Sequence, residues 1–262
     1  MSAPLDLPST FIPGWHDEDA VRCMKYNTLG RTGRAIYALT IGGAGFGGVY
    51  EDCADTAAAQ AAAEIIEPLV RAGINMIDTA PWYGQGRSET VIGAALKAAA
   101  IPRESLYIHT KVGRYEQDPL RQFDFTAARV RASVQESLDR LQVTYLDVVQ
   151  IHDPEFAADP AQLISETLPA LAELKAAGVI RGIGITGYPL HILRYLVEHC
   201  PADIQIDTTI SYARYTVHDT TLADSGTLKL LADAVCVRAT LRPTRCVPAH
   251  VRCTRLRQPA AC

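Results

Sequence analysis

The order of apolar and polar positions predicts alternating strands and helices along most of the chain. Short runs rich in Val and Ile alternate with segments in which apolar residues recur every three or four positions. The predicted strands are 38–42, 74–78, 106–111, 146–152, 181–186 and 203–211. The predicted helices are 57–72, 88–99 with Ser88 as N-cap, 126–141, 161–177, 190–199 and 220–233. Such alternation is typical of a parallel sheet covered by helices, so we expect an α/β fold of about six strand–helix units.

The segment before these units divides into two parts. Residues 1–23 contain several prolines and little periodicity, which predicts a flexible N-terminal arm. In "MKYNTLGRTGRAIYAL", two short apolar runs flank the turn-rich stretch from Gly30 to Gly33, which predicts a β-hairpin. The folded domain is therefore expected to span residues 24–234 and to begin with this hairpin.

Polar groups stand at matching ends of the predicted strands. Two arrangements compete, an open doubly wound sheet and a (β/α)8 barrel, and a barrel gathers its functional groups at the carboxyl ends of its strands. The residues at these ends are Asp78, Lys111, His152 and the pair Thr186–Gly187. Tyr83 lies on the loop that follows Asp78. Each group alone is more often a satisfied structural residue, but their matching positions favour one site at a barrel rim.

These residue types suit proton transfer. A phenol titrates near ~10, which is too high for acid–base work at neutral pH. A neighbouring ammonium stabilises the phenolate, so we expect Lys111 to lower the pKa of Tyr83. A buried lysine needs a counter-ion, which Asp78 supplies, and His152 can hydrogen-bond a reacting oxygen and fix its orientation.

A glycine fingerprint after the first strand is weak. "GGAGFGG" contains G-x-G-x-x-G at Gly43, Gly45 and Gly48, the pattern of a Rossmann dinucleotide site. That motif opens directly into a helix, whereas "VYEDCADT" intervenes here. We therefore disfavour a Rossmann fold and expect these glycines to let the backbone approach a ligand at the rim.

Composition excludes several classes of partner. The 262 residues carry a net charge of −4, so we expect neither nucleic acid nor membrane as a partner. No secretion signal is recognisable, and the seven cysteines lack metal or disulfide spacing, which indicates a protein of the reducing cytoplasm without a metal.

The motifs around the strand ends resemble those of the aldo-keto reductases. They are "IDTAPWYG", "HTKVGRY" and "VVQIHDPE". Longer stretches such as "FDFTAARVRASVQESLDRLQ" and "ISETLPALAELKAAGVIRGIGITGYPL" are similar to the L-galactose dehydrogenase branch of that family. The likeness covers roughly residues 25–234 and implies a (β/α)8 TIM barrel that uses NAD or NADP.

The resemblance assigns roles to individual residues. The family's catalytic tetrad falls on Asp78, Tyr83, Lys111 and His152. Its cofactor contacts fall on Gly45, Asp78, Thr186, Gly187 and Tyr212. Trp82 is expected to line the sugar pocket with Tyr83 and His152, although a purely packing role fits Trp82 equally well.

The reaction implied is oxidation of an aldose at its anomeric carbon. Tyr83 would take the proton of the C1 hydroxyl while a hydride leaves C1 for the nicotinamide, and the product is a lactone. In this branch the expected substrate is L-galactose, oxidised to L-galactono-1,4-lactone in ascorbate biosynthesis. The alternatives are D-arabinose and L-fucose, which the sequence does not separate from it.

The last residues, 235–262, differ in composition from the rest. They hold six arginines and four cysteines but no lysine and no acid, and they show no strand or helix period. This composition is typical of a shifted reading frame, and a natural basic, disordered tail is the alternative. The spacing of Cys246, His250 and Cys253 matches no standard zinc site.

The tail bears on closure of the barrel. With about six units the barrel would lack two strands, and its terminal strands would keep unpaired edges. The family's later segments, which grip the cofactor's phosphates, would be missing as well. A non-catalytic, truncated variant that has lost cofactor binding is therefore the alternative to an active enzyme.

Overall fold

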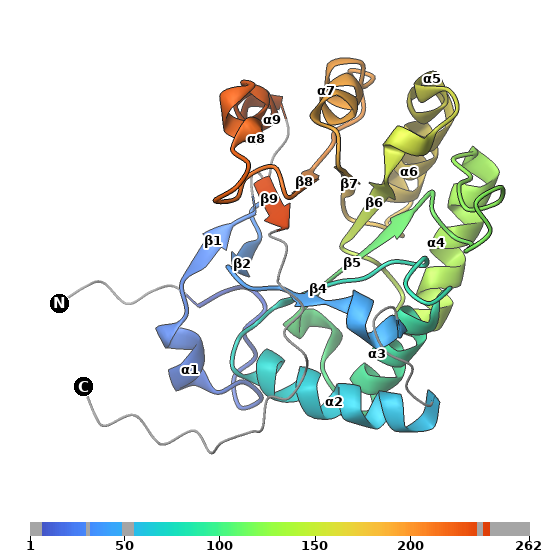
Figure 1. The fold of residues 1–262 in the computed structure, drawn as a ribbon. Helices are drawn as coiled ribbons and strands as arrows, with labels where there is room; N and C mark the ends of the chain where they lie inside the picture. The colour runs from blue at the N-terminus through green and yellow to red at the C-terminus, as the bar shows by residue number, and fades with distance from the viewer. Residues whose placement is uncertain (1–6, 30–31, 49–54, 235–237, 242–262) are drawn as a thin grey trace.

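The computed structural model describes residues 7–29, 32–48, 55–234 and 238–241 (Figure 1). Two antiparallel strands, β1 (Tyr26–Thr28) and β2 (Ala35–Tyr37), form the expected hairpin. The larger sheet has seven parallel strands in the order β3-β4-β5-β6-β7-β8-β9. Its strands are β3 (Ile41–Gly42), β4 (Met76–Asp78), β5 (Tyr107–Val112), β6 (Val148–His152), β7 (Ile183–Gly187), β8 (Thr208–Tyr212) and β9 (Arg238–Leu241).

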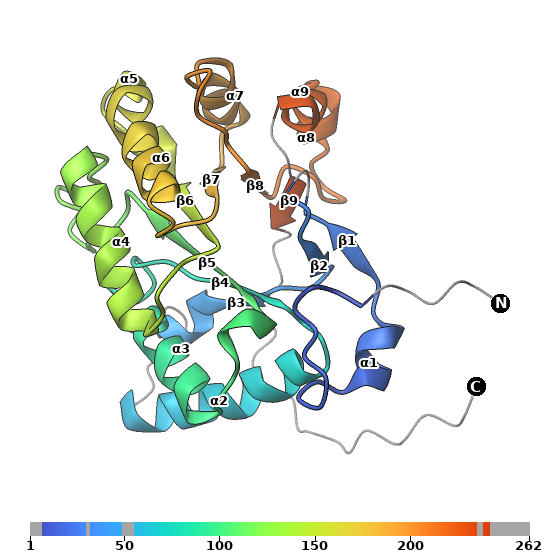
Figure 2. The same ribbon diagram turned by 180° about the vertical axis from the view of Figure 1, so that it is seen from behind.

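Helices follow each strand up to β8 and lie on one side of the sheet (Figures 1 and 2). They are α2 (Asp55–Arg71), α3 (Arg87–Ala98), α4 (Ala127–Leu141), α5 (Pro160–Gln162), the π-helical turn η4 (Leu163–Thr167), α6 (Leu168–Ala176), α7 (Leu190–Glu198), α8 (Thr221–Asp224) and α9 (Thr227–Ala234). Short 3₁₀ turns are η1 (Gly43–Gly47), η2 (Arg103–Ser105) and η3 (Pro154–Phe156). The predicted units are thus confirmed, most with boundaries shifted by a few residues. The helix predicted at 220–233 is instead two helices, α8 and α9, and the strand predicted from residue 203 begins at Thr208.

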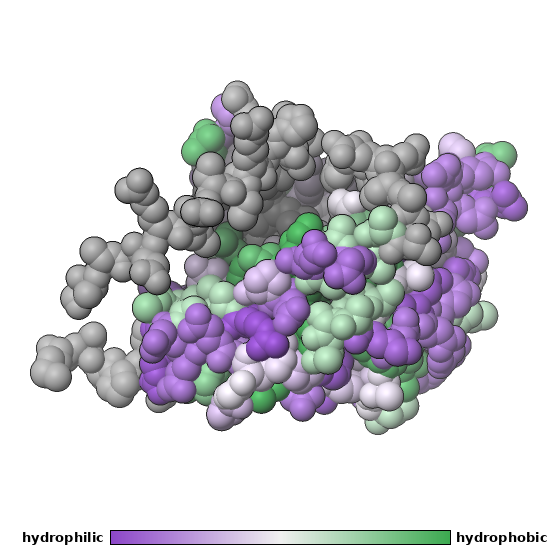
Figure 3. Space-filling model, turned by 90° about the horizontal axis from the view of Figure 1, so that it is seen from below, coloured by the Kyte–Doolittle hydropathy of each residue, from purple (hydrophilic) through white to green (hydrophobic). Residues whose placement is uncertain are grey.

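Each helix turns its apolar side chains toward the sheet and its polar side chains toward solvent. In α2, Ala62, Ile66 and Val70 pack into the core between helices and sheet, whereas Glu64 is exposed. Polar residues cover much of the described surface seen from below, with smaller apolar groups between them (Figure 3). Within the described ranges, no helix combines the length and the apolar character needed to cross a bilayer.

The sheet curls into an open barrel. Each strand pairs with the next one along the chain, without the reversal of strand order that defines a doubly wound sheet. Among the described strands, β3 and β9 form the two edges and do not pair with each other. The expectation of an incomplete (β/α)8 barrel with an N-terminal hairpin is therefore confirmed.

The N-terminal segment is not a free arm over residues 7–23. It contains the helix α1 (Glu18–Cys23), whose N-cap Asp17 accepts a hydrogen bond from Ala20 N. Val21 is buried, and Arg71 of α2 donates to the backbone oxygen of Trp15 at 2.6 Å. The sequence pattern missed this packing because the segment is held by contacts with α2 rather than by its own periodicity. Residues 1–6 lie outside the described part.

The tail also departs from expectation at one place. Arg238–Leu241 form β9, which pairs in parallel with β8, although no strand was expected there. The neighbouring strand supplies backbone hydrogen bonds, which do not depend on an alternating side-chain pattern. The remainder of the predicted tail, including Cys246, His250 and Cys253, lies outside the described residues.

The hairpin lies at the amino ends of the barrel strands. Asn75, directly before β4, donates to Thr10 Oγ1 at 3.0 Å and to Ala35 O at 2.8 Å, and it accepts from Tyr37 N at 3.0 Å. Arg34 donates to Asp147 O at 3.1 Å. The opposite, carboxyl ends of the strands are thereby left open for a site.

Replacing Asn75 by Ala tests this anchor. The substitution leaves two part-buried backbone groups of the hairpin, Tyr37 N and Ala35 O, and buried Thr10 without this partner, so the free energy of unfolding should fall by about 2–4 kcal/mol. Urea denaturation measures the change. Asn27→Ala, at an exposed position on β1, is the control and should change stability by less than about 0.5 kcal/mol. Equal stability of both variants would contradict the anchoring role.

Candidate active site

A buried lysine lies at the centre of the carboxyl end of the barrel. Lys111 is 1% exposed, and its ammonium donates to Asp78 Oδ1 and to Thr79 O, the latter at 2.8 Å. The same nitrogen lies 3.4 Å from the hydroxyl oxygen of Tyr83. The structure thus brings together three of the residues that the sequence singled out.

Strand register explains this convergence. Lys111 of β5 pairs with Gln150 of β6, and His152 of β6 pairs with Thr186 of β7. Because alternate residues of a strand face the same side, Lys111 and His152 lie near the barrel rim on the inner face. The rings of Tyr83 and His152 meet edge to face, with centroids 6.0 Å apart.

Glycines in η1 position the loop that carries Tyr83. A Cβ on Gly47 would lie 2.5 Å from Tyr83 O, and one on Gly84 would lie 2.1 Å from Gly47 O. A Cβ on Gly43 would meet Thr79 Oγ1 at 2.7 Å. Gly43 and Gly47 thus let η1 pack closely on the end of β4 and on the loop that carries Tyr83. Gly45 is exposed, and a Cβ there would meet no atom within 4 Å.

Ser88 has a different role from the one expected. The N-cap of α3 is Gly86, not Ser88. The hydroxyl of Ser88 donates to Gly43 O at 2.7 Å and contacts Thr79 Oγ1 at 2.8 Å. Ser88 therefore ties η1, the end of β4 and α3 together, because its hydroxyl points into the loop packing rather than back along its own helix.

Opposing charges set the protonation of Lys111 and Tyr83. Burial favours a neutral amine, but the adjacent Asp78 carboxylate and Tyr83 phenol together outweigh it and raise the pKa of Lys111. The charge of Lys111 lowers the pKa of Tyr83, as expected. Burial and the charges of Asp78 and Asp153 nevertheless raise the pKa of Tyr83 above its ordinary value overall. The expected direction of the net shift is therefore wrong, because burial first, and then the charges of Asp78 and Asp153, outweigh the influence of the lysine.

His152 is held neutral. Burial, together with the positive charges of Lys111 and Arg114, lowers its pKa well below the usual value. Its Nδ1 has no hydrogen-bond partner among the described residues. A neutral imidazole with a free nitrogen can donate to or accept from a substrate oxygen.

Arg114 and Asp153 form a neutral pair beside these residues. Arg114 Nη1 lies 2.7 Å from Asp153 Oδ2, and burial raises the pKa of Asp153 although Arg114 opposes the change. The guanidinium of Arg114 lies 3.8 Å from the centre of the Trp82 ring. Trp82 is thus a half-buried aromatic stacked on a cation, and its Nε1 has no partner in the described part of the chain.

The expected cofactor residues lie on the next two strands. Thr186 is 5% exposed beside His152, and Gly187 pairs with Ser211 of β8. A Cβ on Gly187 would lie 2.7 Å from Glu155 Oε2. Tyr212 ends β8, is 36% exposed, and packs against Tyr188 with ring centroids 4.6 Å apart.

Sequence reasoning missed Arg114, Asp153 and Gln150. A signal existed for Gln150. Besides Asp147, it is the one polar residue in the otherwise apolar run 146–151. It also lies two positions before His152, so both side chains are expected on the same face of the strand. For Arg114 and Asp153 the signal was opposite charges directly after two neighbouring strands. Their pairing depends on loop geometry, including a left-handed Asp153 with φ 50°.

Comparison with known proteins identifies the family. The aldo/keto reductase family model matches residues 38–233, which is most of the chain. The chain belongs to the aldo/keto reductase family.

Individual relatives of this aldo/keto reductase are similar over most of its length. L-galactose dehydrogenase of Arabidopsis thaliana is 41% identical over 77% of this chain and 60% of its own length. D-arabinose 1-dehydrogenase of Saccharomyces cerevisiae is 37% identical over 72% of this chain and 55% of its own. The chain thus spans little more than half of these curated relatives. An aldo-keto reductase from Bacillus halodurans, solved in its holo form, matches with a TM-score of 0.64 and 29% identity, over 82% of this chain and 66% of its own.

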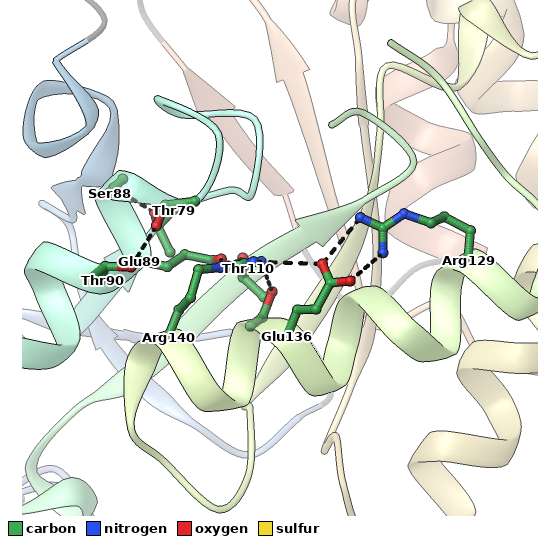
Figure 4. A network of polar contacts seen from close by, with 10 residues as sticks. Thr79, Ser88, Glu89, Thr90, Thr110, Arg129, Glu136 and Arg140 are labelled. Carbon is green, nitrogen blue, oxygen red and sulfur yellow. Dashed lines mark hydrogen bonds and ion pairs between the residues drawn. The ribbon is translucent and has the colours of Figure 1, made fainter. Parts of the chain in front are cut away.

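A polar network supports the candidate site from the outer side of the sheet (Figure 4). Glu89 of α3 is 0% exposed and accepts hydrogen bonds from Thr110 Oγ1 and from Arg140 Nε, the latter at 2.7 Å. Because Thr110 directly precedes Lys111, the network fixes β5 against α3 and α4 at the level of the site.

Stability is expected to depend on pH because His109, two residues before Lys111 on β5, is buried. Burial lowers the pKa of His109 to about 4, whereas an unfolded histidine titrates near about 6.5. Below pH 6.5 the unfolded chain binds a proton that the folded chain does not bind until about pH 4. The free energy of unfolding therefore decreases as the pH is lowered through this range. Between pH 7 and pH 5 this group should cost about 2 kcal/mol.

Urea denaturation at both pH values checks this dependence. His109→Gln should lose about 2 kcal/mol less than wild type between pH 7 and pH 5. The control His191→Gln, at an exposed position on α7, should follow wild type. An unchanged pH dependence in His109→Gln would contradict a neutral His109.

Proposed function

We propose that this protein is an NAD(P)-dependent oxidoreductase that oxidises an aldose at its anomeric carbon. The observation that carries the proposal is the buried ammonium of Lys111, which lies between Asp78 and the phenol of Tyr83 with the neutral His152 beside it. A phenol and an imidazole at one rim, with a fixed cation behind the phenol, can accept a proton from a bound hydroxyl and orient it.

The roles of the residues follow from their charge states. His152 holds the C1 oxygen of the sugar by a hydrogen bond, and Tyr83 accepts the C1 hydroxyl proton. Lys111 stabilises the phenolate form of Tyr83, and Asp78 keeps the lysine charged and in place. Bound NAD or NADP supplies the hydride acceptor. Loss of a hydride and a proton converts the cyclic hemiacetal to a lactone, so electrons and protons balance.

The rim offers partners for a nicotinamide carboxamide. Glu155 Oε2 and Ser211 Oγ are buried without partners among the described residues, and both lie next to Gly187. A carboxamide has N–H groups for a carboxylate and a carbonyl for a hydroxyl, so these orphaned atoms fit it. Thr186 and Gly187 would hold the carboxamide, Tyr212 would stack on the ring, and Gly45 and Asp78 would contact the cofactor from the other side.

The substrate proposed is L-galactose, with L-galactono-1,4-lactone as product, as in ascorbate biosynthesis. Support comes from the 41% identity with a protein named L-galactose dehydrogenase. Similarity to a D-arabinose 1-dehydrogenase favours D-arabinose as the second candidate, and L-fucose belongs to the same chemical class. Trp82 would form one wall of the sugar pocket, where Arg114 stacks on it and Asp153 neutralises Arg114.

Turnover by the purified chain tests the proposal. NAD or NADP is combined with L-galactose, D-arabinose or L-fucose, and formation of reduced nicotinamide is followed by its absorbance. Tyr83→Phe should lower kcat by at least about 100-fold, because it removes the proton acceptor and keeps the ring. Cofactor affinity, measured by fluorescence titration, should change by less than about twofold.

The control is Tyr195→Phe on the outer helix α7, which should keep wild-type kcat. Absence of turnover, together with no cofactor-induced rise of Tm, would contradict the proposal. That outcome would instead support a non-catalytic chain that has lost cofactor binding.

A further inference from the structure

Asp78 has a second partner that the tetrad does not include. One carboxylate oxygen, Oδ1, accepts from Lys111, and the other, Oδ2, accepts from Gln150 Nε2 at 2.7 Å. Gln150 is 0% exposed and lies on the inner face of β6. Both oxygens of the carboxylate are therefore engaged, and its plane is fixed between β5 and β6.

Gln150 reaches across one strand to make this contact. Asp78 is on β4, and β5 lies between β4 and β6. Gly184 of β7, the register partner of Gln150, leaves the space in which the side chain lies. A Cβ at position 184 would stand 2.7 Å from Gln150 Cγ and 2.3 Å from Thr208 Oγ1. The inner face is thus built to accommodate an extended Gln150.

A filling role alone does not account for Gln150. Its Oε1 has no partner among the described residues, and an amide buried with half of its capacity unused costs free energy. An apolar side chain would fill the space without that cost. The nitrogen of the amide donates to Asp78, the carboxylate that binds the ammonium of Lys111.

We propose that Gln150 is a positioning residue, which holds Asp78 so that the ammonium of Lys111 remains directed at Tyr83. This inference rests on the function proposed above. The amide donor also withdraws negative charge from Asp78, so less of the lysine's field is cancelled at the phenol. Without the donor, the freed carboxylate can turn both oxygens toward Lys111 and draw the ammonium away from Tyr83.

The charges around Tyr83 set the expected direction. Of the charged groups, Lys111 of β5, Asp78 of β4 and Asp153 on the loop after β6 shift its pKa. His152 of β6 meets the Tyr83 ring edge to face and is held neutral, and Arg114 pairs with Asp153. Lys111 is the group that lowers the pKa of Tyr83 most. Weakening its influence moves that pKa upward, so the rising limb of the rate profile moves to higher pH.

Gln150→Met is the direct test, because methionine has nearly the same length but no donor. The pH profile of kcat for aldose oxidation should shift upward by about one pH unit, which is a tenfold lower kcat on the rising limb. KM should change by less than about twofold, since no substrate contact is lost. Gln150→Asn keeps an amide that is too short to reach Asp78, and it should show the same shift.

Thr208→Val is the matched control. Thr208 lies beside the same Gly184, and its Oγ1 has no hydrogen-bond partner among the described residues, so the pH profile of Thr208→Val should equal that of wild type. Crystal structures of wild type and Gln150→Met give a readout independent of turnover. The distance from Lys111 Nζ to the Tyr83 hydroxyl oxygen should increase beyond 3.4 Å in the variant.

The outcomes separate the two proposals. An unchanged pH profile in Gln150→Met and Gln150→Asn, with wild type active, overturns the role of Gln150 and leaves the function standing. An inactive wild type in which Gln150→Met still displaces Asp78 and Lys111 overturns the function and supports the positioning role. Unchanged positions of Asp78 and Lys111 in the variant structure overturn the positioning role in either case.

Discussion

The burial of one ammonium group constrains the rest of the site. Lys111 is 1% exposed, and removing such a charge from water costs several kcal/mol unless the protein replaces its hydration. Asp78 and the backbone oxygen of Thr79 provide that replacement. Both come from the end of β4, so β4 and β5 must keep their register, and the loop that begins at Thr79 must return over the barrel rim.

The same ammonium has to serve two purposes that oppose each other. Asp78 must balance its charge so that it can be buried. Its positive charge must nevertheless still be felt at the Tyr83 oxygen, where it stabilises the phenolate. In the structure, burial and the charge of Asp78 together outweigh the lysine, and the pKa of Tyr83 is raised overall. Groups that modulate Asp78, such as Gln150, or that add negative charge nearby, such as Asp153, therefore bear directly on the chemistry.

Local patterns in the sequence predict the strands, the helices and the residues at the strand ends. Asp78, Lys111 and His152 are found from their position alone, because parallel strands bring their carboxyl ends to one rim. Contacts between distant segments carry no such pattern. Gly43 and Gly47 pack on the Tyr83 loop, and Ser88 bonds Gly43 rather than capping its helix.

The remaining differences have the same origin. The segment 7–23 is held by Arg71 of α2, and β9 by its neighbour β8, so neither shows in local periodicity. The net shift of the Tyr83 pKa depends on burial and on Asp153, which are known only once the loops are placed.

The dependence of the site on the Lys111–Asp78 pair is tested most directly by a double-mutant cycle in stability. Lys111→Met, Asp78→Asn and the double variant are compared by urea denaturation. Each single change leaves one buried charge unpaired and should cost about 3–5 kcal/mol, whereas the double variant should cost much less than the sum. Strictly additive costs would show that the two groups do not hold each other, and would contradict the account.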